Sequence, residues 1–61
     1  MRDKRAVTLA LALETGADVR TVGRWLDGKL DSRPLDWAFR QAARMLKLVD
    51  DVDAVRAGSV S

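Results

Sequence analysis

The sequence has no cysteine and no histidine. Without thiols it cannot form disulfides or thiolate metal sites, and without imidazole it lacks the usual side chain for acid–base chemistry near neutral pH. A zinc finger is therefore excluded. The longest apolar stretch, Val7 to Leu13 with Thr8 inside it, is far too short to cross a bilayer, and no cleavable secretory pattern follows the N-terminal basic residues. We expect a cytoplasmic protein with no membrane contact.

Catalytic and metal-binding groupings are missing as well. No serine, lysine or carboxylate falls in a recognisable catalytic arrangement, so we expect neither an enzyme nor a cofactor. Asp50, Asp51 and Asp53 are close together, but the rest of a twelve-residue calcium loop and its terminal glutamate are missing. Helix capping is the better explanation for these carboxylates, and we expect no metal.

Length and charge are those of one small folded domain. The 61 residues are 48% hydrophobic and 33% charged, a balance typical of a packed domain, which we place at residues 1–57. The net charge is only +2, but residues 1–49 hold ten basic and six acidic side chains, whereas residues 50–61 carry a net −2. The positive charge therefore lies with the first three predicted helices.

The first predicted helix covers about residues 5–15, with Asp3 at its start and Gly16 as its C-cap. Alternating apolar residues between positions 7 and 13 also fit a strand, but the interspersed alanines favour the helix. A second helix is predicted at 18–27, with Asp18 as N-cap and Gly28 after its end. The apolar face expected for the first helix comprises Val7, Ala10, Leu11 and Leu13.

In the second helix, a spacing of 100° per residue puts Val22 and Leu26 on the inward face, with Val19 and Trp25 toward its edge. Arg20 and Arg24 then lie on the opposite face, one turn apart. This separation leaves two long cations on the side that the core does not use.

A third, longer helix is predicted at 34–49, because Ser32 and Pro34 suit a helix start. Residues 50–57 either continue this helix or form a separate short one capped by Asp50 or Asp51, and residues 58–61 are expected to fray. The stripe expected to be buried comprises Leu35, Phe39, Ala42, Leu46 and Val49. The expected fold is all-α, a compact bundle of three to four helices.

The segment LALETGADVRTVGRWL, residues 11–26, resembles the helix-turn-helix of lactose-repressor-like and lambda-repressor-like bacterial regulators. Ala12 is the small residue that lets the two helices approach, and Gly16 suits the positive φ of the turn. Asp18 takes the N-cap position, and residues 21–24 (TVGR) match the family's T-V-x-R run. The apolar positions of the motif are occupied by Ala17, Val22 and Trp25.

The resemblance implies that the second helix enters a DNA major groove by its N-terminal half. Val19, Arg20 and Arg24 then lie nearest the base edges, where an arginine fork pairs with guanine and a valine contacts a thymine methyl. Phosphate contacts, which fix register without selecting sequence, are expected from Thr21 and Lys29 and from the N-terminal Arg2, Lys4 and Arg5.

Two residues depart from this pattern. Asp27 lies on the exposed side of the second helix, where it either repels phosphate or pairs with Lys29. Gly23 lies inside a helix, at a cost of about 1 kcal/mol relative to alanine, and permits close approach to DNA or to another protein element.

Two tryptophans have different expected roles. We expect Trp25 in the core, because its inward angle and bulk suit a domain with few other aromatics. Trp37 points away from the third helix's apolar stripe, so Trp37 and Leu48 are candidate contacts in a two-fold dimer or with another protein partner. The alternative for Trp37 is packing on the connector at 28–33.

The function expected from the sequence is specific binding of double-stranded DNA. The resemblance implies a small bacterial, phage or plasmid regulator, a repressor, that binds an inverted repeat as a homodimer without a cofactor. The alternatives are an excisionase-like factor that bends DNA and a protein-interaction module, such as an antitoxin or an accessory subunit, that uses the same helices.

Overall fold

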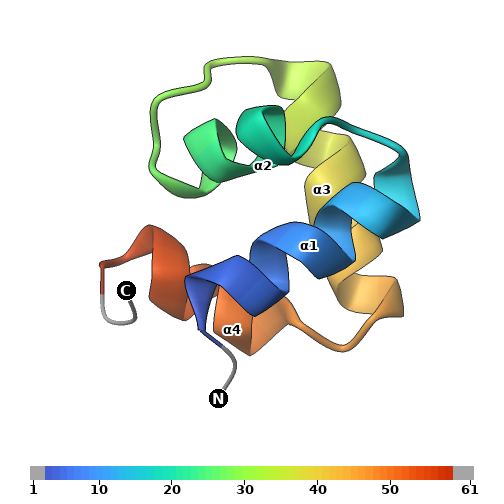
Figure 1. Cartoon of the computed structure of the whole chain (residues 1–61), viewed down its shortest axis with the longest axis vertical. Coiled ribbons are helices and arrows are strands. Elements are labelled where there is room, and N and C mark those ends of the chain that lie inside the picture. The colour runs from blue at the N-terminus through green and yellow to red at the C-terminus, as the bar shows by residue number, and fades with distance from the viewer. Residues whose placement is uncertain (1–2, 59–61) are drawn as a thin grey trace.

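The structure is a computed structural model that describes residues 3–58. In this range the chain forms four helices and no strand: α1 (Lys4–Thr15), α2 (Val19–Leu26), α3 (Arg33–Met45) and α4 (Val49–Arg56). The predicted all-helical bundle is confirmed (Figure 1). None of the helices is long and apolar enough to span a membrane, as judged over the same residues.

The ends of α1 and α2 are set by the residues that the sequence indicates. The carboxylate of Asp3 accepts a hydrogen bond from the Ala6 N–H at 2.9 Å, and that of Asp18 accepts one from the Arg20 N–H at 3.0 Å. Gly16 ends α1 with a left-handed φ of 75°, which turns the chain into α2. Both helices therefore begin and end within one residue of their predicted bounds.

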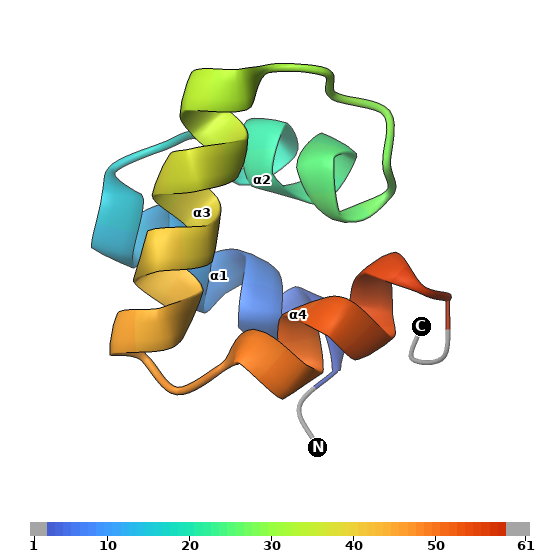
Figure 2. The ribbon, with the colours of Figure 1, turned by 180° about the vertical axis from the view of Figure 1, so that it is seen from behind.

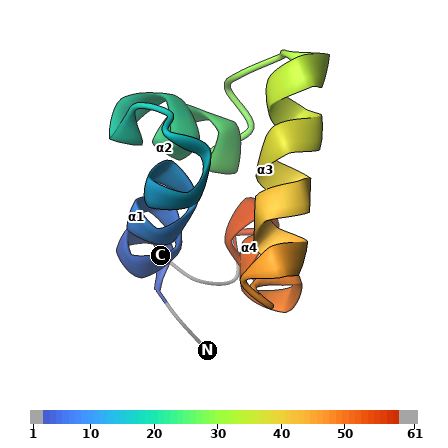
Figure 3. The same ribbon diagram turned by 90° about the vertical axis from the view of Figure 1, so that its right-hand side faces the viewer.

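The helices surround a single apolar core. Figure 3 shows α1 and α2 on one side of the molecule and α3 on the other, and Figure 2 shows α4 crossing below them. Every helix contributes buried side chains to this core, which excludes water from the space between the two sides. The buried apolar residues are Val7, Leu11, Ala12, Val22, Trp25, Leu26, Phe39, Ala42, Ala43, Leu48, Val52 and Val55.

The buried face of α1 differs from the prediction at one residue. Leu13 is 86% exposed, whereas Val7, Thr8, Leu11 and Ala12 form the inward face. Leu13 lies two residues from Leu11 and therefore about 200° away around the helix, so it cannot share that face. The placement of Leu13 in the core was wrong.

The predicted long helix at 34–49 is two helices. α3 ends at Met45, and Lys47 then adopts a left-handed φ of 58° before α4 begins at Val49. This break ends the predicted stripe, since Leu46 and Val49 are 37% and 41% exposed. Of the alternatives for residues 50–57, the separate helix is correct.

The same break turns Leu48 inward. Its N–H donates to the Ala43 carbonyl at 2.7 Å, and its side chain is 3% exposed and packed in the core. Leu48 therefore does not lie on the surface, and its assignment as a dimer or partner contact was wrong. Capping by Asp50 or Asp51 is also not observed, because Leu48 is the N-cap residue and both aspartates lie in the first turn of α4.

Candidate nucleic-acid interface

The exposed face of α2 carries the two arginines that the motif singles out. Val22, Trp25 and Leu26 are buried, and this places Arg20 and Arg24 on the solvent side, where both are exposed. Within residues 3–58 neither guanidinium has an ion-pair or hydrogen-bond partner. Both cations are therefore available to an external ligand.

The other predicted contact residues lie around this face at different degrees of exposure. Val19, at the N-terminus of α2, is 46% exposed, so it lies at the edge of the core and its side chain reaches the surface. Thr21 is half-buried, and Lys29 is exposed after the end of α2. On α1, Lys4 is half-buried and Arg5 is exposed, while Arg2 lies outside the described residues.

A groove runs between the N-terminal half of α1 and the first turns of α2. It is open to solvent, with a volume of about 490 Å³. α1 contributes Lys4, Arg5, Thr8 and Leu9, α2 contributes Val19 and Gly23, and Asp3 lines one end. We call this the α1/α2 groove. It brings basic side chains of α1 next to Val19 and Gly23 of α2, although they are more than ten residues apart in the sequence.

Gly23 faces this open space. A Cβ atom built on Gly23 meets no heavy atom within 4 Å, once its chain neighbours and the helix's own backbone are set aside. Packing within residues 3–58 therefore does not require a glycine here. This excludes crowding within residues 3–58 as the reason for the glycine, and it leaves close approach to DNA or to another protein.

Asp27 has an ion-pair partner that neither sequence-based alternative named. Its carboxylate forms an ion pair with the ammonium group of Lys4, across the helix pair from α2 to α1. The hydrogen bond from Lys4 lowers the pKa of Asp27, and the nearby charge of Lys29 acts in the same direction. The negative charge on the exposed side of α2 is thus compensated by a lysine that is 23 residues away in sequence.

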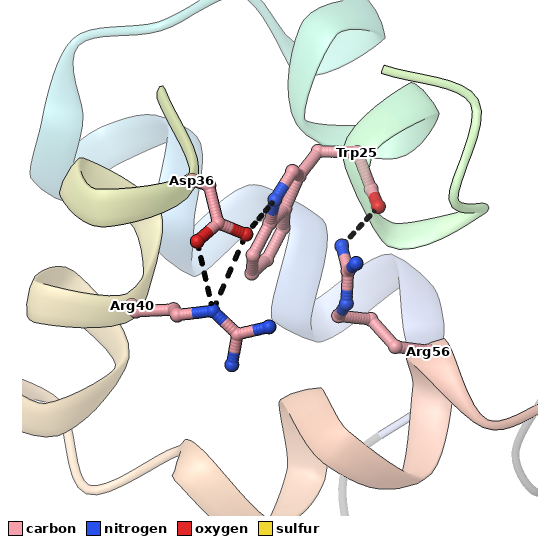
Figure 4. Close-up of polar contacts among 4 residues, drawn as sticks. All are labelled: Trp25, Asp36, Arg40 and Arg56. Carbon is pink, nitrogen blue, oxygen red and sulfur yellow. Dashed lines mark hydrogen bonds and ion pairs between the residues drawn. The ribbon is translucent and has the colours of Figure 1, made fainter. Parts of the chain in front are cut away.

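The C-terminal end of α2 is held by a polar cluster that the sequence analysis did not predict (Figure 4). The buried Trp25 indole N–H donates to Asp36 on α3 at 3.0 Å, and the Arg40 Nε donates to both oxygens of the same carboxylate at 3.1 and 3.2 Å. Arg56 from α4 donates to the Trp25 carbonyl and lies 4.3 Å from the ring centroid. The Asp36–Arg40 spacing of four residues was the only sequence signal for this cluster.

The cluster fixes α2 relative to the rest of the fold. The hydrogen bond from Trp25 lowers the pKa of Asp36, and Arg40 adds to this effect against partial burial, which raises it. The Trp25 ring also packs against Phe39 at a centroid distance of 5.1 Å. Trp25 is 1% exposed, so the expectation that it belongs to the core is confirmed. Its position excludes base stacking by this side chain.

Trp37 is the largest exposed apolar side chain of the described residues, at 67% exposure. It does not pack into the connector at 28–33 deeply enough to bury its ring.

Residues 3–58 contain no cluster of three side chains able to hold a metal ion. Comparison with known proteins finds no matching family model, curated protein or solved structure.

Proposed function

We propose that this chain binds double-stranded DNA, with α2 lying in the major groove. The observation that carries the proposal is the division of α2 into two faces. One face holds the buried side chains of the helix, whereas the other offers two guanidinium groups, one turn apart, that have no ion-pair partner within residues 3–58. An arginine fork with no intramolecular partner suits the paired acceptors of a guanine edge.

The surroundings of α2 support a duplex as the ligand. The α1/α2 groove offers Arg5 together with Gly23, where a Cβ atom would meet no heavy atom of residues 3–58 within 4 Å, so a phosphate backbone has room to approach. The Asp27 charge is compensated by Lys4, which offsets one source of repulsion on this side. Thr21 and Lys29 border the same face and suit phosphate contacts.

We further propose that the protein is a transcription regulator of the repressor type, acting as a homodimer on an inverted repeat without a cofactor. Two copies related by a two-fold axis present two α2 helices, and such proteins bind half-sites about 34–36 Å apart.

The direct test compares Arg20→Ala and Arg24→Ala with Arg33→Ala, which removes an exposed arginine from the start of α3. A duplex selected from random sequences serves as the probe, with binding followed by fluorescence anisotropy. We expect each α2 variant to lose about 1–3 kcal/mol of binding free energy and the α3 variant to lose far less. Circular dichroism checks that all three variants fold.

Three results would contradict parts of this proposal. Equal losses for all three variants would mean that charge alone drives binding. Retained DNA binding with loss of a protein partner would favour a protein-interaction module. A large bend in circular-permutation mobility shifts would favour an excisionase-like role over simple operator binding.

A further inference from the structure

A second groove lies between α3 and α4, and these two helices supply all of its lining residues. Its volume is about 320 Å³, and we call it the α3/α4 groove. Its apolar floor includes Ala43, Val49 and Val52, and Trp37 borders it from α3. An exposed indole beside an apolar groove is typical of protein contact surfaces, since aromatic side chains are enriched at the centres of interfaces.

The walls of this groove carry opposite charges. Arg44 lines it from α3 and Asp53 lines it from α4, and neither has an ion-pair partner within residues 3–58. Arg40 also lines the groove but is already paired with Asp36. Each wall therefore presents one uncompensated charge of its own sign.

We propose that the α3/α4 groove binds a second copy of this chain, with Trp37 of each copy inserted into the groove of the other. A two-fold axis makes each surface its own partner, so Arg44 of one copy faces Asp53 of the other in both halves of the interface. A partner helix that carries charge of only one sign would be repelled by one of the two walls, whereas a second copy of this chain supplies both signs. The surface is thus complementary to itself.

Pairing through this groove leaves α2 uncovered, because α2 and α3 lie on opposite sides of the molecule (Figure 3). The molecule extends 16 Å along the axis that separates these sides. Along this axis, two such thicknesses and one helix-to-helix spacing separate the two α2 helices by at most roughly 40 Å. Half-sites one turn of DNA apart, about 34–36 Å, fall within this limit. The inference therefore deepens the proposed function by naming the surface that joins the two copies.

Self-association of the full chain without DNA tests this directly by sedimentation equilibrium, at concentrations up to about 1 mM because small interfaces bind weakly. We expect a monomer–dimer equilibrium that Trp37→Ala weakens by about thirtyfold or more. Leu13→Ala is the matched control, since it removes an apolar side chain of α1 that is even more exposed than Trp37, and it should leave the equilibrium unchanged.

Charge exchange tests the pairing itself. Arg44→Asp and Asp53→Arg alone should each weaken the dimer about tenfold, whereas the double variant should restore it to within about threefold of the original. A monomeric wild-type chain at 1 mM, unaltered association of Trp37→Ala, or no rescue in the double variant would overturn the inference. Arg20→Ala and Arg24→Ala should each weaken DNA binding by about five- to 150-fold without altering self-association, so failure of the proposed function is distinguishable from failure of this dimer.

Discussion

Replacing Gly23 by alanine should have opposite effects on the stability of the fold and on its affinity for DNA. Gly23 lies inside α2, where glycine costs about 0.5–1 kcal/mol relative to alanine because its backbone loses more freedom on folding. The added methyl group meets no heavy atom within 4 Å and fills part of the α1/α2 groove. The isolated protein should therefore gain stability from this substitution.

The expected gain is about 0.5–1 kcal/mol, which in a domain of this size raises the melting temperature by roughly 3–8 °C. Gly28→Ala provides a matched control, because a Cβ there also meets no atom within 4 Å but the residue has a φ of 75°. An alanine is strained in that conformation, so Gly28→Ala should lower the melting temperature. Thermal unfolding followed by circular dichroism measures both.

Binding should change in the opposite direction from stability. If a duplex approaches the backbone of α2 at Gly23, the methyl group keeps it away, and we expect the affinity of Gly23→Ala for its selected duplex to fall about tenfold. A variant that is more stable and binds DNA as tightly as the original would refute the close approach. A variant that is less stable would refute the placement of Gly23 on an open groove.

Three further predictions concern the polar contacts around α2. Asp36→Ala leaves the buried indole N–H of Trp25 without an acceptor and should cost about 1–3 kcal/mol of unfolding free energy. Asp36→Asn keeps an acceptor and should cost less. Urea unfolding compares the two variants, and equal losses would contradict the role of this hydrogen bond. Folding lowers the pKa of Asp27 and of Asp36 below the ordinary value of 3.8, so the stability that both carboxylates contribute is present at neutral pH and lost as the pH falls through those lowered values. Urea unfolding repeated from pH 7 to about pH 2.5 should show this loss, and the loss should be smaller in Asp36→Asn. Lys4→Ala leaves the Asp27 charge beside α2 unpaired and should weaken DNA binding about threefold. Adding Asp27→Asn in a double variant should restore the affinity. If anisotropy titrations show no such rescue, Lys4 acts by contacting phosphate itself.

The sequence predicts α1, α2 and the turn between them well because their signals are local. Asp3, Gly16 and Asp18 set helix ends through hydrogen bonds and φ angles that involve only near neighbours. The division of α2 into buried and exposed faces likewise follows from helix periodicity alone. These elements were placed correctly for that reason.

The second half of the chain was harder to predict because its break has no local signal. Lys47 adopts a left-handed φ that is uncommon outside glycine and asparagine, and nothing in the spacing of Leu46 and Val49 indicates that the helix ends before them. The apolar period continues across the break, so the pattern favoured one long helix. Core packing of Leu48 and Val52, which is a property of the whole fold, accompanies the break.

The Lys4–Asp27 ion pair and the polar cluster around Trp25 could not be predicted from the sequence either. Lys4 and Asp27 are 23 residues apart, and Trp25 and Arg56 are 31 residues apart. Such pairs depend on how helices pack, and no spacing rule along one helix reaches that far. Only the contact between Asp36 and Arg40, one turn apart on α3, could be predicted from spacing along the sequence.

The bond from Arg56 to the Trp25 carbonyl has a consequence for biosynthesis. During translation the N-terminal segment leaves the ribosome first, but a helix as short as α2 is marginal in water until tertiary packing supports it. The guanidinium that holds its last turn belongs to the final helix of the described chain. A nascent chain that stops before α4 should therefore carry the complete arginine motif and yet lack the rigid helix that presents it.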